Sequence, residues 1–298
     1  MSIIAIVGPT ASGKTALSIK IAKRFNGEIV SADSRQIYRG MDIGTAKPSA
    51  EELRAIPHHL INIKNPDEEY TVAEYKKDAI AAIEEILKKG KLPVLAGGTG
   101  LYVRAVLENL DIPSVKANPA LRKKLETEIE KEGLDAVFKK LVALDPEAAY
   151  VVDPKNPRRV VRALEVAIIT GKPFTAQRKK NEPLFDALTI GIDVPSETIR
   201  ERIDRRVDRM MKDGLLREVR GLVQTYGQDC QAFDAIGYRE LINHLKGALS
   251  LDEAVALMKT NTWQYARRQM TWFRKDKNIN WIKSEEEAMK LSEKYLGE

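Results

Sequence analysis

Short apolar runs alternate with amphipathic stretches over the first hundred residues. Ile3–Val7, Glu28–Ala32 and Leu92–Ala96 are short and mainly apolar, which is typical of strands that are buried on both faces. Ala16–Phe25 and the stretch after Thr71 place apolar residues at helical spacing between these runs. Because strands alternate with helices, the pattern predicts an α/β fold with a doubly wound parallel sheet.

The strand pattern stops after residue 112. Three amphipathic helices are predicted in the next stretch, over Leu121–Lys131, Leu134–Leu144 and Arg158–Thr170. Leu188–Ile192 then returns the chain to the sheet, and we expect helices from there to the end. The prediction is a core domain of residues 1–112 and 183–298, interrupted by a helical insertion domain over residues 113–182.

The loop after the first strand carries the strongest chemical signal. Residues 8–15 have the sequence Gly-Pro-Thr-Ala-Ser-Gly-Lys-Thr, which fits a phosphate-binding loop between a strand and a helix. The backbone N–H groups and the helix N-terminus would surround an anion, Lys14 would add a positive charge, and the Thr15 hydroxyl would face Mg²⁺. The loop therefore predicts a P-loop NTPase-like sheet that binds a diphosphate or triphosphate.

Composition narrows the class of protein only moderately. The 298 residues carry a net charge of +6, which favours an anionic partner. No apolar run is long enough for a membrane span, and the single Cys230 indicates a reducing cytoplasm. Three histidines are too few for a His/Cys metal cage. We expect a cytoplasmic monomer.

Two aspartates are candidates for acid–base or metal chemistry beside the loop. The strand that ends at Ala96 is followed by glycines, so the second Mg²⁺-binding acid of a nucleotide hydrolase is missing there. Asp33 and Asp193 each follow a strand. Asp33 could bind Mg²⁺ or accept a proton, and it could also simply cap a short helix.

Arginines cluster on a predicted helix over residues 198–211. Ile199, Ile203, Val207 and Met210 form its apolar stripe, and Arg206 lies at the edge of this stripe. An arginine there favours a cleft over open solvent, where a guanidinium binds a diphosphate well. The alternative is a surface arginine that packs its aliphatic part on the protein.

Two further basic segments have alternative interpretations. Residues 263–275 interleave aromatic and cationic side chains on both helix faces, which suits either RNA binding or a helix packed on two sides. Arg158, Arg159 and Arg162 form a patch that, taken alone, indicates a solvated helix face.

The motifs together resemble the family of bacterial tRNA dimethylallyltransferases. Beyond the phosphate loop, the resemblance rests on seven segments that follow the family order along the chain. These are residues 31–38 (SADSRQIY), 41–48 (MDIGTAKP), 57–59 (PHH), 97–102 (GGTGLY), 158–165 (RRVVRALE), 236–240 (IGYRE) and 267–274 (RRQMTWFR).

The resemblance implies transfer of a dimethylallyl group from its diphosphate to an adenine exocyclic amine. The adenine lies next to the anticodon on its 3′ side, in tRNAs that read codons beginning with U. The loop would then hold the leaving pyrophosphate with Mg²⁺ rather than ATP, and Asp33 would be the general base. Partners would be dimethylallyl diphosphate and the tRNA anticodon stem-loop, with no membrane.

The residue patterns and the resemblance together predict three groups of site residues. The catalytic group is Asp33, Thr99 and Arg206. The diphosphate group is Gly8, Pro9, Thr10, Ala11, Ser12, Gly13, Lys14 and Thr15, with Thr15 also at the metal. The tRNA group is Asp33, Ser34, Arg35, Gln36, Thr99, Arg158, Arg159, Arg162, Gly237, Tyr238, Arg239, Arg267, Arg268, Gln269, Trp272 and Arg274.

Three other functions fit parts of the pattern. A P-loop small-molecule phosphotransferase would use the same loop and consume ATP. A prenyltransferase acting on free adenine nucleotides would leave the basic C-terminal half without a role. An RNA-binding module that uses the loop as a nucleotide switch would leave its RNA chemically unchanged.

Overall fold

The computed structural model describes residues 1–297 except 114, 116 and 178–180. The described chain divides into two compact units. Unit 1 comprises Met1–Tyr70, Tyr75–Leu107 and the chain from Leu184 onward, and unit 2 comprises Thr71–Glu74 and Glu108–Pro183. The expectation that residues 113–182 form a separate insertion domain remains a prediction.

Unit 1 is built on a parallel sheet. Six strands are found in the described part of the chain, in the order β3-β2-β4-β1-β5-β6. Every pair of neighbours is parallel, so all carboxyl ends lie at one edge. The strands are β1 Ser2–Val7, β2 Gly27–Ser31, β3 His58–His59, β4 Leu92–Gly97, β5 Asp186–Ile192 and β6 Ile279–Ile282.

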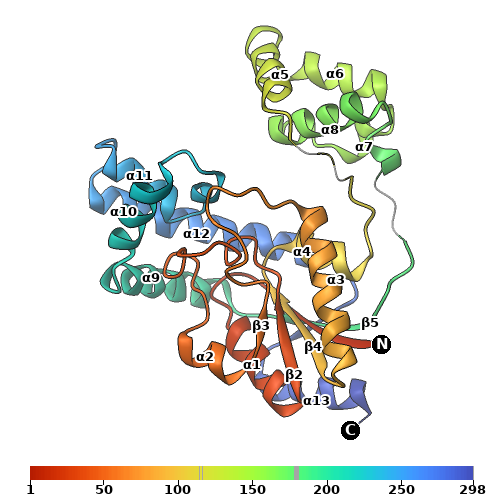
Figure 1. The fold of residues 1–298 in the computed structure, drawn as a ribbon, viewed down its shortest axis with the longest axis vertical. Helices are drawn as coiled ribbons and strands as arrows, with labels where there is room; N and C mark the ends of the chain where they lie inside the picture. The colour runs from red at the N-terminus through yellow and green to blue at the C-terminus, as the bar shows by residue number, and fades with distance from the viewer. Residues whose placement is uncertain (114, 116, 178–180, 298) are drawn as a thin grey trace. The chain divides into compact units, whose positions relative to one another are not determined.

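Helices cover both faces of this sheet (Figure 1). Ile4 and Ile6 of β1 pack with α1 and α13 on one face, and alternation directs Ile3, Ala5 and Val7 to the other. There α3 and α4 meet through the stacked rings of Tyr75 and Tyr102, with centroids 3.7 Å apart. The bounds are α1 Lys14–Arg24, α2 Ala50–Ala55, α3 Val72–Lys88, α4 Gly100–Leu107 and α13 Glu285–Leu296.

A second apolar cluster in unit 1 holds the C-terminal helices together. It includes the predicted stripe residues Ile199, Ile203 and Val207 of α9, which are buried against Met258 and Ala266 of α12. The helices are α9 Ser196–Lys212, α10 Leu215–Tyr226, α11 Tyr238–Leu245 and α12 Leu251–Phe273, with a short 3₁₀ helix over Gln231–Asp234.

Unit 2 confirms the three helices predicted for its stretch of sequence. They are α5 Pro119–Glu132, α6 Leu134–Leu144 and α8 Pro157–Thr170, and the short helices α7 Ala148–Val151 and η1 Thr175–Gln177 are additional. Leu125, Val137, Leu141 and Val160 contribute to an apolar core of its own.

The expectation of helices alone after residue 192 is wrong at one place. Ile279–Ile282 forms the edge strand β6, which pairs with β5. The sequence Ile-Asn-Trp-Ile is short and has a polar residue at its second position, so its apolar pattern is too weak to predict a strand. The neighbouring strand supplies the pairing that local sequence does not.

Candidate active site

The phosphate loop joins the end of β1 to the start of α1. Gly8 and Gly13 have φ angles of +147° and +99°, which glycine reaches without the strain that a Cβ would bring. Ala11 also has a positive φ, of +63°. A Cβ at Gly8 would also approach the Ser12 Oγ within 3.2 Å. The loop therefore curls tightly at the N-terminus of an 11-residue helix, which is a favourable place for an anion.

Ser12 shows that the loop fits an oxyanion. Its side chain is buried, with 4% of the residue exposed, and its Oγ has no hydrogen-bond partner within the described residues. A buried hydroxyl without a partner is unfavourable by about 1–3 kcal/mol. A phosphate oxygen in the loop would accept this hydrogen bond and remove the penalty.

Lys14 brings a positive charge to the phosphate loop, and this charge depends on the protonation of its amine. Its Nζ donates to the carbonyl of Pro9 over 2.7 Å. Burial lowers the pKa of Lys14 to about 8, and the charges of Asp33 and Arg206 act on it in opposite directions. Because a diphosphate stabilises the ammonium form, its binding would raise this pKa again.

Arg206 reaches the loop from α9. Its Nη1 donates to the Thr10 hydroxyl over 3.3 Å, and burial, followed by the nearby charge of Arg209, lowers the pKa of the guanidinium. Arg202 lies one turn earlier, with its Nη1 at 3.5 Å from the Ala11 carbonyl. The helix thus directs Arg206 toward the loop, as expected from its place beside the apolar stripe.

Asp33 lies just beyond the end of β2, near enough to Lys14 for the two charges to interact. One carboxylate oxygen, Oδ1, accepts the N–H groups of Arg35 and Gln36 at 2.8 and 3.4 Å. Asp33 thus caps a turn over residues 34–37 and not the short helix considered as an alternative. Its Oδ2 has no hydrogen-bond partner in the described part of the chain. Capping and proton acceptance can therefore be divided between the two oxygens.

Thr99 ties the loop after β4 to the residue that follows Asp33. Its N–H donates to the Ala32 carbonyl over 3.1 Å, and its hydroxyl accepts the N–H of Ser34 over 3.0 Å. A Cβ at Gly97 would lie 2.1 Å from the Ala32 carbonyl oxygen, so a glycine is required for this close approach. The loops that follow β2 and β4 therefore lie in direct contact.

The sequence profile of the IPP transferase family matches residues 36–276. A tRNA dimethylallyltransferase of Acetivibrio thermocellus is 48% identical over 289 residues, covering 96% of this chain and 92% of the relative. The relative of the same name in Geobacter metallireducens is 47% identical over 94% of this chain and 92% of its own.

The chain belongs to the IPP transferase family.

Solved structures agree with this membership. The full-length tRNA isopentenylpyrophosphate transferase of Bacillus halodurans superposes with a TM-score of 0.73 at 42% identity, over 99% of this chain and 96% of that one. A eukaryotic dimethylallyltransferase described as acting on tRNA gives 0.77 at 30% identity, over 95% and 73% of the chains. The chain is therefore an enzyme of the tRNA dimethylallyltransferase class, as the motif resemblance implied.

Several IPP transferase motif residues predicted to touch tRNA use their polar groups inside unit 1. Arg35 donates to the Ala232 carbonyl over 3.3 Å, and Gln36 donates to the Ala46 carbonyl over 3.3 Å. Gly237, with φ +98°, caps α11, and the buried Tyr238 donates to Glu218 over 2.6 Å. These contacts give many of the motif residues a structural role within unit 1 that requires no contact with tRNA.

Other predicted tRNA residues are exposed cations. Arg239, Arg267 and Arg268 of unit 1 and Arg158 and Arg159 of unit 2 all present exposed side chains. Arg162 differs, because its guanidinium is half-buried and pairs with the fully buried Glu165 at 2.6 Å. Trp272 packs over Gly100, where a Cβ would lie 2.1 Å from its indole nitrogen.

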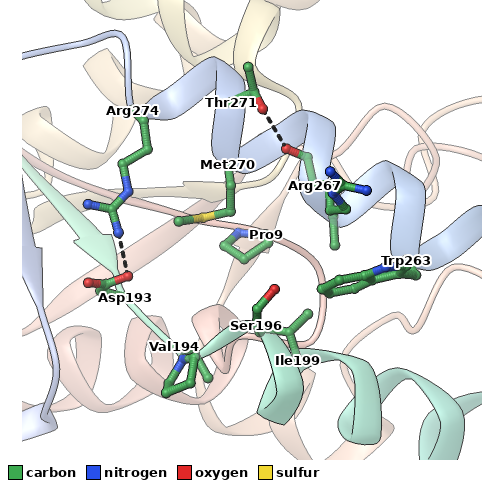
Figure 2. A pocket seen from close by; sticks show the side chains of 12 residues that line it. Pro9, Asp193, Val194, Ser196, Ile199, Trp263, Arg267, Met270, Thr271 and Arg274 are labelled. Atoms are coloured by element: carbon green, nitrogen blue, oxygen red, sulfur yellow. Dashed lines mark hydrogen bonds and ion pairs between the residues drawn. The ribbon is translucent and has the colours of Figure 1, made fainter.

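An open cavity of about 400 Å³ is lined in part by Pro9 of the phosphate loop. Trp263 and Met270 of α12 and Arg274, which directly follows this helix, line the cavity (Figure 2). Arg274 is held there by Asp193, with 2.6 Å between Nη2 and Oδ1, so this aspartate lies with the arginine rather than at the phosphate loop.

Tyr265 belongs to the site although the sequence pattern did not single it out. Burial, followed by the charge of Asp33, raises the pKa of its phenol to about 12 against a hydrogen bond with Thr99. The signal available in the sequence was its position four residues before Gln269, on the same face of α12.

No group of three or more His, Cys, Asp or Glu side chains that could hold a metal occurs among residues 1–297 outside the gaps. Mg²⁺ commonly binds one or two protein oxygens and completes its shell with phosphates and water. Thr15 at the start of α1 fits that sparse donor set. In the described chain, no helix is both long and apolar enough to cross a membrane.

Proposed function

We propose that the chain transfers a dimethylallyl group from dimethylallyl diphosphate to the N6 amine of an adenosine in tRNA. The adenosine is the one 3′-adjacent to the anticodon in tRNAs that read codons beginning with U. One observation carries the proposal: Lys14, Arg206 and the unpartnered Ser12 hydroxyl gather at a phosphate loop, while Asp33 and Thr99 lie at the neighbouring strand ends.

The proposed step exchanges one bond for another. The N6 lone pair attacks C1 of the allyl group, a C–N bond forms, and the C–O bond to pyrophosphate breaks. An adenine amine is a weak nucleophile, so transfer of its proton to the free Oδ2 of Asp33 assists the reaction. The proton then passes to water, and pyrophosphate leaves with the bonding electrons.

The loop stabilises the charge that develops on the leaving group. Lys14 and Arg206 face the same loop, and preorganised cations in a partly dehydrated site stabilise such charge far better than water does. Mg²⁺, held by the Thr15 hydroxyl and the diphosphate, would add Lewis-acid neutralisation of the same oxygens. The diphosphate-binding set is Gly8, Pro9, Thr10, Ala11, Ser12, Gly13, Lys14 and Thr15.

The proposed enzyme acts as a monomer. Its RNA partner is the anticodon stem-loop. The target base must leave its stack to reach the donor, so the surrounding RNA needs cationic and aromatic contacts. Exposed arginines on both units support this role: Arg158, Arg159, Arg239, Arg267 and Arg268. Arg267 and Arg274 border the cavity beside Pro9, which suits a nucleotide flanking the target.

Undermodified tRNA incubated with labelled donor and Mg²⁺ tests the proposal directly. Mass analysis of the digested tRNA should reveal an adenosine that carries one added dimethylallyl group, with one pyrophosphate released per transfer. The Arg206→Ala variant should mainly raise KM for the donor. Consumption of ATP without a prenyl donor, or tRNA of unchanged mass, would reject the proposal in favour of a phosphotransferase or an RNA-binding module.

A further inference from the structure

Gln269 has its whole amide group inside the protein. It lies in the last third of α12 with only 6% of the residue exposed. Its Oε1 accepts the N–H of Thr10 over 2.8 Å, and its Nε2 donates to the Gly98 carbonyl over 2.8 Å. A glutamine amide has one acceptor and one donor group on the same carbon, so this single side chain bridges two backbone segments.

The two bridged segments belong to opposite sides of the reaction. Thr10 is in the phosphate loop, and its hydroxyl also accepts from Arg206 at 3.3 Å. Gly98 precedes Thr99, whose hydroxyl accepts the N–H of Ser34, the neighbour of Asp33. The amide of Gln269 therefore stands between the donor-binding loop and the acceptor-side loop.

The glycines of the acceptor-side loop fit this bridge sterically. A Cβ at Gly98 would lie 2.3 Å from the Gln269 Nε2, and a Cβ at Gly100 would lie 2.1 Å from the Trp272 Nε1. No neighbouring atom can be that close to a real Cβ. Two glycines thus match two side chains that lie about one turn apart on α12, which fixes the helix on the loop.

We propose that Gln269 is a positioning residue that holds the phosphate loop and the Thr99 loop at one fixed separation, rather than a contact to tRNA. The inference rests on the proposed prenyl transfer, because the fixed separation sets the distance between the allylic carbon and the amine. Misplacement of reacting groups by about 1 Å can slow a reaction about 100-fold.

Two substitutions separate the hydrogen bonds from the packing. Gln269→Met keeps the length of the side chain and removes both bonds, so kcat should fall about 100-fold while tRNA affinity stays unchanged. Gln269→Glu keeps the acceptor for Thr10 but turns a carboxylate oxygen toward the Gly98 carbonyl. Gln224→Met, at an exposed position of α10, is the matched control and should behave as wild type.

The pH profile of the glutamate variant gives a signature that general destabilisation would not produce. A protonated carboxyl group presents one O–H and one C=O, as the amide presents N–H and C=O. The ratio of Gln269→Glu to wild-type kcat should therefore rise about tenfold from pH 8.5 to pH 6, since a buried carboxyl protonates readily. Gln269→Met should show no such recovery.

Binding of inorganic pyrophosphate, measured by titration calorimetry, separates this inference from the proposed function. Gln269→Met should weaken it about tenfold, because Thr10 loses its tether. If the wild type transfers no prenyl group, the proposed function fails while this arm still tests the tether. Wild-type kcat and pyrophosphate affinity in Gln269→Met, or a flat Gln269→Glu ratio, would overturn the positioning role.

Discussion

The N–H of Ser34 donates to the hydroxyl of Thr99 over 3.0 Å and joins the loops that follow β2 and β4. The two residues are 65 positions apart in sequence, yet their contact fixes the backbone beside Asp33. The proposed acceptor site therefore depends on a hydrogen bond between loops rather than on either loop alone.

Thr99→Val should weaken catalysis while the fold is retained. Valine matches threonine in shape but cannot accept the Ser34 N–H, so the loop that carries Asp33 loses one anchor. We expect kcat to fall about tenfold or more and the free energy of unfolding to drop by about 1–2 kcal/mol. Thr99→Ser, which keeps the hydroxyl, is the control and should retain most of the turnover under tRNA saturation.

Asp33→Asn separates capping from proton acceptance. The asparagine oxygen can still accept the Arg35 N–H that Asp33 now binds at 2.8 Å, so the turn should persist. An amide cannot act as the base, so kcat should fall about 10²–10⁴-fold with tRNA affinity unchanged. Single-turnover kinetics together with filter binding would measure both. Equal turnover in Asp33→Asn and wild type would remove Asp33 from the base role.

Donor capture should weaken as the pH rises through the pKa of Lys14, which is about 8 in the free enzyme. The ammonium binds the diphosphate and the neutral amine does not, so kcat/KM for the donor should fall above that pH. Lys14→Arg keeps its charge throughout this range and should flatten the limb. A limb that persists in Lys14→Arg must come from another group.

The contribution of Lys14 to the free energy of unfolding should change with pH in the opposite direction. Burial favours the neutral lysine in the folded chain, so the unfolded chain binds more protons between pH 8 and the ordinary value of 10.5. The free energy of unfolding therefore gains from Lys14 as pH rises through that window. Lys14→Met should remove this gain in urea titrations at pH 8 and pH 10.

Glu165 should make unit 2 sensitive to acid. Burial alone would raise the pKa of this carboxyl, but hydrogen bonds from Arg122, the Asn118 N–H and Arg162 lower it below its ordinary value of 4.5. A lowered carboxyl pKa contributes stability that is present above pH 4.5 and is lost as pH falls through the folded value.

The matched pair Glu165→Gln and Glu130→Gln tests this expectation. Glu130 is exposed on α5, so its substitution should be nearly neutral. Glu165→Gln should lower the free energy of unfolding at pH 7 by about 1–3 kcal/mol and reduce its loss below pH 4.5. Urea titration followed by far-ultraviolet circular dichroism measures both, and equal effects of the two substitutions would contradict the role of Glu165.

The strongest local patterns were enough to predict most of the fold. Apolar patterns alone predict β1, β2, β4, β5 and the buried stripe of α9, because each of these elements buries its apolar side chains. β3 has two residues and β6 has four, so pairing with a neighbour, not composition, makes them strands. The phosphate loop was predictable because its glycines and lysine are adjacent in sequence.

Side-chain direction limited what could be predicted of the site. The segment over residues 263–275 suited RNA binding and internal packing equally, and in the structure some of its side chains are buried while others are exposed. Arg267 remains exposed, whereas the Gln269 amide is buried and the half-buried Trp272 ring packs over Gly100. Spacing on a helix indicates which residues share a face, but only the neighbouring segments determine what that face meets.

β1 pairs with β5, so two segments that precede and follow most of unit 2 in the sequence lie side by side in the sheet. Thr10 is hydrogen-bonded to Gln269, which lies 259 positions later in the sequence. A growing polypeptide on the ribosome could build the helices of unit 2 from nearby contacts first. Its pyrophosphate-holding loop would gain its last support only when nearly the whole chain has emerged. Truncated translation products would therefore lack a finished donor site, however well their first strand and helix had formed.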